Sequence, residues 1–267
     1  MKTWAELISE VPDVPPELLQ WWLSDFFDAS LTHLPLQDSP SESQLTAFTQ
    51  AVVRLKTGEP VQYVCGRTPF RDLELHIDAR VLIPRPETEQ LVQIALDRFI
   101  TSGDRVLDVG TGSGCIALSI KKARPGCQVS ARDISAEALE VARENARRLG
   151  LDVDFKQADL LTEEPFRSSE LIIANLPYIG EIEKADLPEN VREFEPHLAL
   201  FSGDDGTPLI KKLLKQALDV LTPEGVVLLE TGEHQGAIWR QQATELGWQV
   251  ESICDLADRE RFWIFKR

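Results

Sequence analysis

The sequence predicts an α/β fold in which a mostly parallel sheet, covered by helices on both faces, follows a small helical region. From residue 104 onward, short apolar strands alternate with helical segments, and such alternation produces parallel strands joined by crossover helices. Residues 1 to about 60 instead place apolar side chains at helical spacing. The last two strand-like segments, residues 248–255 and 261–267, are expected to close the sheet as an antiparallel pair.

The N-terminal region is expected to contain helices separated by prolines. Two sets of apolar residues recur at helical spacing: Leu19, Trp22, Leu23 and Phe26, then Leu45, Phe48, Val52 and Leu55. We interpret most of the aromatic residues among them as the core of a small helical domain, residues 1–75.

The segment from 61 to 83 alternates loosely and contains turn residues, a pattern that favours short strands or a hairpin. We assign the hairpin and linker to residues 76–86. A helix is expected to begin near Pro86 or Glu87, because proline suits the first helical turn. Residues 87–267 then form the α/β domain.

Within that domain, residues 105–110 read as the first strand, and a helix follows near Gly114. Ser135 can cap the next helix, which Gly150 ends. The remaining strands are expected within residues 128–133, 153–159, 170–177 and 225–232, with a helix over about 208–221.

Composition limits the kind of protein. Glu6 and Glu10 interrupt the N-terminus before any apolar region, and no apolar run approaches the roughly 20 residues that span a bilayer. We therefore expect a cytoplasmic protein with no membrane partner. The net charge of −16 opposes direct nucleic-acid binding, which normally needs a basic face. The four cysteines form no C-x-x-C pair and the four histidines are scattered, so no metal site is expected.

A glycine-rich loop is the candidate cofactor site. Asp108 begins the run Asp-Val-Gly-Thr-Gly-Ser-Gly, which ends the first strand at Gly110, Thr111, Gly112, Ser113 and Gly114. Glycines let the backbone turn sharply and approach a ligand. The third glycine comes one residue too early for the dinucleotide fingerprint G-x-G-x-x-G. The spacing instead resembles motif I of class I methyltransferases, whose loop passes under the methionine part of S-adenosylmethionine.

Two acidic positions follow later strands. Asp133 lies 23 residues beyond Gly110, where an acid can accept hydrogen bonds from ribose hydroxyls. Alternatively, it is an acid favoured by the N-terminus of the next helix. Asp159 and Leu160 follow the third strand, where the resemblance implies contact with adenine.

The candidate acceptor site is Asn175-Leu176-Pro177-Tyr178, at the end of the fourth strand. A planar nitrogen needs acceptors for its N–H groups and an aromatic face that holds its plane. Asn175 offers a side-chain carbonyl, Leu176 a backbone carbonyl and Tyr178 a ring, while Pro177 favours an extended Leu176. Two accepted hydrogen bonds would orient an amide and stabilise the charge that develops on its nitrogen. The alternative is a strand that simply ends in a turn.

Nearly the whole chain resembles the HemK/PrmC family of release factor glutamine methyltransferases. The resemblance rests on Gly58 to Phe70, on Leu82 to Glu89 (Leu-Ile-Pro-Arg-Pro-Glu-Thr-Glu), on Asp108 to Gly114 with Asp133, on Glu195 to Leu200 with Gly203 and Gly206, and on Glu230, Gly232 and Gln235.

It implies a Rossmann-like methyltransferase that uses S-adenosylmethionine, yields S-adenosylhomocysteine and methylates the side-chain nitrogen (N5) of the glutamine in the Gly-Gly-Gln motif of peptide chain release factors. It also implies that residues 1–75 recognise the substrate protein, that Arg85 and Glu87 bind substrate, that Asn175 touches the cofactor, and that Asn175 and Tyr178 are catalytic.

Leu176 replaces the first proline of the family's Asn-Pro-Pro-Tyr motif. Asn-Leu-Pro-Tyr is typical of ribosomal-RNA adenine N6-dimethyltransferases, which are the alternative. Those enzymes carry their extra helical domain after the catalytic domain and lack a counterpart of residues 82–89. A catalytically dead module that only binds the release-factor loop is a third possibility, and calorimetry of cofactor binding would separate it.

Overall fold

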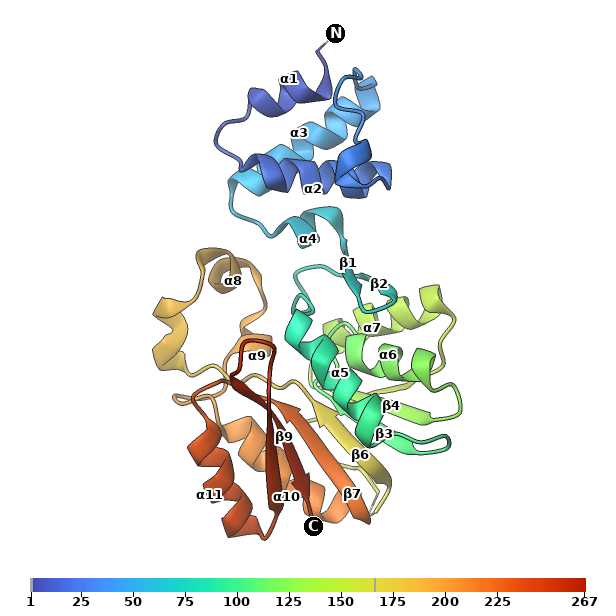
Figure 1. The fold of residues 1–267 in the computed structure, drawn as a ribbon, viewed down its shortest axis with the longest axis vertical. Coiled ribbons are helices and arrows are strands. Elements are labelled where there is room, and N and C mark those ends of the chain that lie inside the picture. Colours follow the sequence, from blue (N-terminus) through green and yellow to red (C-terminus); the bar gives the residue numbers. More distant parts are fainter. Residues whose placement is uncertain (1, 166) are drawn as a thin grey trace.

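The computed structural model describes residues 2–165 and 167–267. Its N-terminal helices stand apart from the sheet (Figure 1). They are α1 (Trp4–Ser9), α2 (Pro16–Phe27), α3 (Glu42–Lys56) and α4 (Val61–Cys65), with the 3-10 turn Leu31–His33 between α2 and α3. Trp4, Leu19, Leu23 and Phe48 are buried in a core of their own. Trp22 and Phe48 are buried while Phe26 is 39% exposed, so the expectation that most of these aromatic residues form a core is confirmed.

The hairpin lies earlier than expected. Its strands are β1 (Arg67–Phe70) and β2 (Leu73–His76), so residues 77–85 carry neither helix nor strand. Residues 61–65, expected as strand, are helical, because Pro60 precedes the helix and Gly66 ends it with φ at +72°. Phe70, Leu73 and Leu75 join the core of the catalytic region.

Seven strands form the main sheet in the order β5-β4-β3-β6-β7-β9-β8. They are β3 (Arg105–Val109), β4 (Gln128–Asp133), β5 (Asp154–Gln157), β6 (Ser169–Ala174), β7 (Leu221–Glu230), β8 (Gln249–Cys254) and β9 (Glu260–Lys266). The five strands from β5 to β7 are parallel, and β9 pairs antiparallel with both β7 and β8. The predicted fold class, with its closing antiparallel strands, is confirmed.

Helices cover both faces of the sheet (Figure 1). One core contains apolar residues of α5 (Pro86–Arg98), α6 (Cys115–Ala123) and α7 (Ala136–Leu149). The other contains residues of α10 (Pro208–Val220) and α11 (Gly236–Leu246). Ser135 caps α7 through Ala138 N and Gly150 ends it, as the sequence predicts.

Between β6 and α10 the chain forms three short elements that no sequence pattern indicated. They are the 3-10 helix η2 (Glu181–Asp186), α8 (Glu189–Phe194) and α9 (His197–Leu200). Phe194 lies 3.8 Å from where a side chain at Gly58 would begin, so α8 reaches the end of the N-terminal region. Among the described residues, no helix is long and apolar enough to cross a bilayer.

Candidate active site

A cavity of about 400 Å³ lies at the carboxyl ends of the parallel strands. Strand order reverses between β3 and β6, which is where open α/β sheets bind ligands. A volume in the range of about 300–1,000 Å³ is usual for small-molecule and cofactor sites. The walls come from within residues 79–85, 109–116, 132–138, 158–160 and 175–177, with Thr88, Pro196, Leu198, Ala199 and Leu209.

The glycine loop forms one wall. Gly110, Gly112 and Gly114 all have positive φ angles, of 74°, 54° and 85°, a conformation that favours glycine. Nothing lies within 4 Å of the position that a Cβ on Gly112 would occupy, so this residue borders open space. Gly114 does not line the cavity; it lets Leu118 and Ala142 approach instead.

Asp108 holds the loop from below. Its Oδ2 accepts hydrogen bonds from the Thr111 hydroxyl at 2.6 Å and from Ala117 N at 3.2 Å. The carboxyl group is fully buried, and burial raises its pKa to about 7. Asp108 is therefore a support of the loop and does not line the cavity.

Asp133 contacts the start of α7 and also lines the cavity. Its Oδ2 accepts from Gly112 N and its Oδ1 from Ser135 N, both at 2.9 Å. It therefore joins the glycine loop to the start of α7 while it lines the cavity. Burial raises the pKa of its carboxyl group.

Asp159 and Leu160 line the same cavity at the end of β5. The Asp159 carboxylate pairs with Lys212 Nζ at 2.5 Å. Leu160 is 6% exposed and has a φ of +56°, which is rare for a branched apolar residue and holds its side chain in the wall.

Of the acceptor motif, Asn175, Leu176 and Pro177 line the cavity. Leu176 packs directly on the glycine loop: its Cδ2 lies 2.7 Å from where a Cβ on Gly110 would be. The leucine that replaces the family's proline therefore fills the space that Gly110 leaves open.

Tyr178 is not among the lining residues. Its hydroxyl lies 3.5 Å from Glu230 Oε1, and its carbonyl accepts a hydrogen bond from Gln235 Nε2 at 2.8 Å. A Cβ on Gly206 would lie 2.0 Å from that carbonyl oxygen, so the loop before α10 closes tightly over the motif.

Arg85 lines the cavity and pairs with the buried Glu195 at 2.5 Å. Glu195 also accepts a hydrogen bond from Ile83 N at 3.3 Å. This pair joins two of the segments that carry the family resemblance, residues 82–89 and 195–200. Glu87 is half-buried in the first turn of α5 but does not line the cavity.

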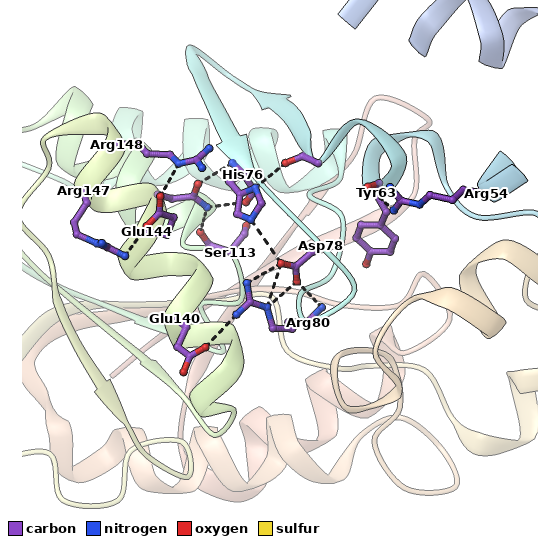
Figure 2. A network of polar contacts seen from close by, with 12 residues as sticks. Arg54, Tyr63, His76, Asp78, Arg80, Ser113, Glu140, Glu144, Arg147 and Arg148 are labelled. Carbon is purple, nitrogen blue, oxygen red and sulfur yellow. Dashed lines mark hydrogen bonds and ion pairs between the residues drawn. The ribbon is translucent and has the colours of Figure 1, made fainter. Parts of the chain in front are cut away.

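The linker after the hairpin also reaches the cavity. Arg80 lines it and is held by Asp78 at 2.7 Å and by Glu140 at 3.1 Å (Figure 2). Sequence reasoning assigned Arg80 no role, although it stands five residues before Arg85.

Thr88 and Glu230 lie in motifs that carry the family resemblance, but sequence reasoning gave neither of them a role in the site. Thr88 donates to Glu230 Oε2 at 2.8 Å and accepts from Asn175 Nδ2 at 3.0 Å. Glu230 is 1% exposed, and burial raises its pKa to about 7. The sequence signal that could have identified Glu230 is an acidic residue at the end of an apolar strand.

The described residues contain no group of three or more histidine, cysteine, aspartate or glutamate side chains that could hold a metal ion. The cavity instead combines an open glycine cradle with the Asp133 carboxylate and an apolar wall at Leu160. This donor set fits S-adenosylmethionine, which presents a charged methionine portion, ribose hydroxyls and an adenine ring.

Two family models match the chain. A methyltransferase domain covers residues 100–266, and the PrmC N-terminal domain covers residues 3–66. The second match coincides with α1–α4 and ends where the hairpin begins.

Two relatives are release factor glutamine methyltransferases. The chain is 39% identical over 241 residues to the release factor glutamine methyltransferase of Koribacter versatilis, covering 79% of this chain and 86% of that protein. It is 38% identical over 262 residues to the one of Neisseria gonorrhoeae, covering 97% and 95%.

Solved structures support the fold alone. A methyltransferase from Pyrococcus furiosus superposes with a TM-score of 0.56 at 22% identity, over 73% of this chain and 90% of that one. The ribosomal protein L11 methylase from Lactobacillus delbrueckii gives 0.54 at 21%, over 74% and 95%. From the domain models and the extended identity, the chain belongs to the release factor glutamine methyltransferase family and is an S-adenosylmethionine-dependent methyltransferase.

Proposed function

We propose that this enzyme methylates N5 of the glutamine in the Gly-Gly-Gln motif of peptide chain release factors. The observation that carries the proposal is the position of Asn175, which lines the cavity beside Gly110 and Leu176. An amide nitrogen bound there would lie next to the methyl donor. The name that the relatives share supports a release factor as the substrate.

S-adenosylmethionine supplies an electrophilic methyl group when it is bound. We assign Gly110, Thr111, Gly112, Ser113, Asp133, Asp159 and Leu160 to its site, with Gly114 and Asp108 as supports of the loop.

The acceptor amide would donate its two N–H groups to Asn175 Oδ1 and to the Leu176 carbonyl. This orientation directs the nitrogen lone pair at the methyl carbon. The bound cofactor would supply the methyl group and keep the S–C bonding electrons on its sulfur, and the surplus proton on the acceptor nitrogen would leave to water. Arg85 is proposed to contact the substrate from the opposite wall. Tyr178 does not border the cavity, so it is proposed to act from the side of the motif that faces Glu230.

We further propose that the N-terminal helices bind the release factor, that nucleic acid is not bound directly, and that the enzyme works in the cytoplasm. The ribosomal-RNA methylase alternative rests on Leu176 alone. The helical region that precedes the catalytic domain and the net charge of −16 oppose it.

The test supplies radiolabelled S-adenosylmethionine together with a release factor and deproteinised ribosomal RNA. We expect label only in the protein, and mass spectrometry should locate one added methyl group on the Gly-Gly-Gln glutamine. Leu176→Pro keeps the carbonyl and should preserve or raise this activity. Label in RNA alone would overturn the proposal.

A further inference from the structure

Four side chains form a partly buried chain of polar contacts that links the acceptor motif to α5 and β7. Asn175 follows β6, Thr88 stands in the first turn of α5, Glu230 ends β7, and Tyr178 completes the motif. Asn175 Nδ2 donates to Thr88 Oγ1 at 3.0 Å, and Thr88 donates to Glu230 Oε2 at 2.8 Å. The Tyr178 hydroxyl is more distant, at 3.5 Å from Glu230 Oε1.

The direction of these hydrogen bonds follows from the chemistry of the last member. An ionised carboxylate only accepts, so the single Thr88 proton must point at Glu230. The Thr88 oxygen then has only lone pairs left for Asn175, and it can pair with the Asn175 NH₂ group but not with its carbonyl. Thr88 and Glu230 are 2% and 1% exposed, so no bulk water competes for these sites.

These hydrogen bonds determine which group of the Asn175 amide is left for a ligand. With Nδ2 held by Thr88, the carbonyl oxygen is the group left for a ligand, and none of the described residues donates a hydrogen bond to it. Asn175 lines the cavity. A reversed amide would present N–H groups there and would repel the N–H groups of a glutamine.

We propose that Glu230 and Thr88 are positioning residues that fix the orientation of the Asn175 amide, so that its carbonyl oxygen is always the group that receives the substrate nitrogen. This inference rests on the proposed function for the role of Asn175. It adds that the polarity of the acceptor site is set by a carboxylate that touches neither substrate nor cofactor.

The ionisation of Glu230 makes the orientation of the Asn175 amide sensitive to pH. Burial raises the pKa of Glu230, Thr88 and Arg261 on β9 lower it, Glu87 on α5 raises it and Tyr178 lowers it, and the net result is a pKa of about 7. Protonated Glu230 can donate to Thr88, and Thr88 can then donate to the carbonyl of a reversed Asn175. The rate of methylation is therefore expected to rise with pH through about 7.

The decisive comparison is Thr88→Val against Thr88→Ser. Valine keeps the shape and removes the hydroxyl, whereas serine keeps the hydroxyl. We expect Thr88→Val to lower kcat by about ten- to a hundredfold, as losses of positioning groups do, with the Kd for S-adenosylmethionine unchanged. Thr88→Ser should recover most of the rate. Glu230→Gln can accept or donate, so it should lower kcat at pH 8 and remove the limb of the pH profile near 7.

Two results would overturn the proposal. One is a folded Thr88→Val enzyme with the wild-type kcat. The other is an equal loss in Thr88→Val and Thr88→Ser that follows a fall in Tm.

Nuclear magnetic resonance tests the hydrogen bond without substrate. The resonance of one Asn175 side-chain amide proton should shift in ¹⁵N-labelled Thr88→Val and keep its position in Thr88→Ser. No shift in Thr88→Val would refute the hydrogen bond between Asn175 and Thr88. Wild-type enzyme that yields no methylglutamine refutes the proposed function instead, and the amide resonances still test the orientation of Asn175.

Discussion

At the scale of single residues, buried acids surround the cavity at the carboxyl edge of the sheet. Asp108 and Glu230 are 0% and 1% exposed, and each meets only one or two neutral donors. Desolvation therefore outweighs hydrogen bonding, and the pKa of each rises to about 7. Both acids hold neighbouring residues by hydrogen bonds, and their titration makes the free energy of unfolding depend on pH.

The free energy of unfolding of the ligand-free protein is expected to fall as pH rises from about 5 to 8. The ordinary pKa values of 3.8 and 4.5 apply to Asp108 and Glu230 in the unfolded chain, so between those values and about 7 the native state binds more protons. The pKa of Asp78 and of Glu170 is lowered, so these groups titrate below this window. Urea unfolding at several pH values measures the slope, and Glu230→Gln should reduce it. A stability that rises from pH 5 to 8 would contradict this expectation.

Asn175→Ala should lower the methylation rate strongly. The variant removes an acceptor aimed at the charge that develops on nitrogen, a loss that typically costs about a hundredfold or more. Calorimetry should find the affinity for S-adenosylmethionine mostly intact, with a modest decrease if Asn175 also touches the methionine portion. A rate close to that of the wild type would remove Asn175 from the chemistry.

Gly112→Val should weaken cofactor binding severely. Gly112 has a φ of +54° and borders the cavity, so a β-branched side chain would strain the loop and project into the ligand's space. Gly150→Val is the matched control: its φ is +65° and its Cβ would also meet nothing, but it lies at the end of α7, outside the cavity. Equal cofactor affinities in the two folded variants would refute the assignment of the loop.

At the scale of elements, the hairpin, α7 and the glycine loop are joined by one buried amide. Asn145 on α7 accepts from His76 N at 2.7 Å and donates to His76 O and Ser113 O, both at 2.9 Å. His76 and Ser113 lie close together beside α7 (Figure 2). The connection between the two domains is therefore tied to the loop that borders the cofactor cavity.

Asn145→Ala should lower both stability and cofactor affinity. It leaves buried backbone groups of His76 and Ser113 without partners, at a cost of about 3 kcal/mol. Glu144→Ala, one position away, removes only exposed ion pairs with Arg147 and Arg148 and should change little. Thermal unfolding and calorimetry measure the two effects. An unchanged cofactor Kd in Asn145→Ala would show that the loop does not depend on the hairpin.

At the scale of the whole molecule, α1–α3 lie on the side toward which the carboxyl ends of the parallel strands point (Figure 1). Their core is separate from that of the catalytic region, whose buried clusters begin at Tyr63. A whole protein needs a larger contact surface than one glutamine side chain provides. The helices stand where a protein substrate could span both parts.

Deleting residues 1–58 should therefore separate recognition from chemistry. The truncated enzyme keeps α4 and the hairpin, so it should still bind S-adenosylmethionine, while methylation of an intact release factor falls sharply. A short Gly-Gly-Gln peptide is the control substrate, because it cannot reach the helices and should be methylated at similar low rates by both forms. Methylation of the intact factor at the full-length rate would refute the recognition role.

The sequence by itself determined the features that depend on neighbouring residues. Alternating strands and helices, the positive φ of Gly112, the cap at Ser135 and the grouping of Asn175 with Leu176 follow from local sterics and from burial of one face. The same signals placed a hairpin within residues 61–83, where it lies, but not its bounds, since Pro60 and Gly66 define a helical turn over residues 61–65.

Only the tertiary structure decided which distant groups meet. Thr88 and Glu230 are 142 positions apart, and Arg85 and Glu195 are 110 apart. The first pair meets because α5 packs against β7, which lies beside β6, and the second because the segment after β6 returns to the cavity. Periodicity reports how one element is buried. It carries no information on strand order, and strand order sets the contacts that orient Asn175.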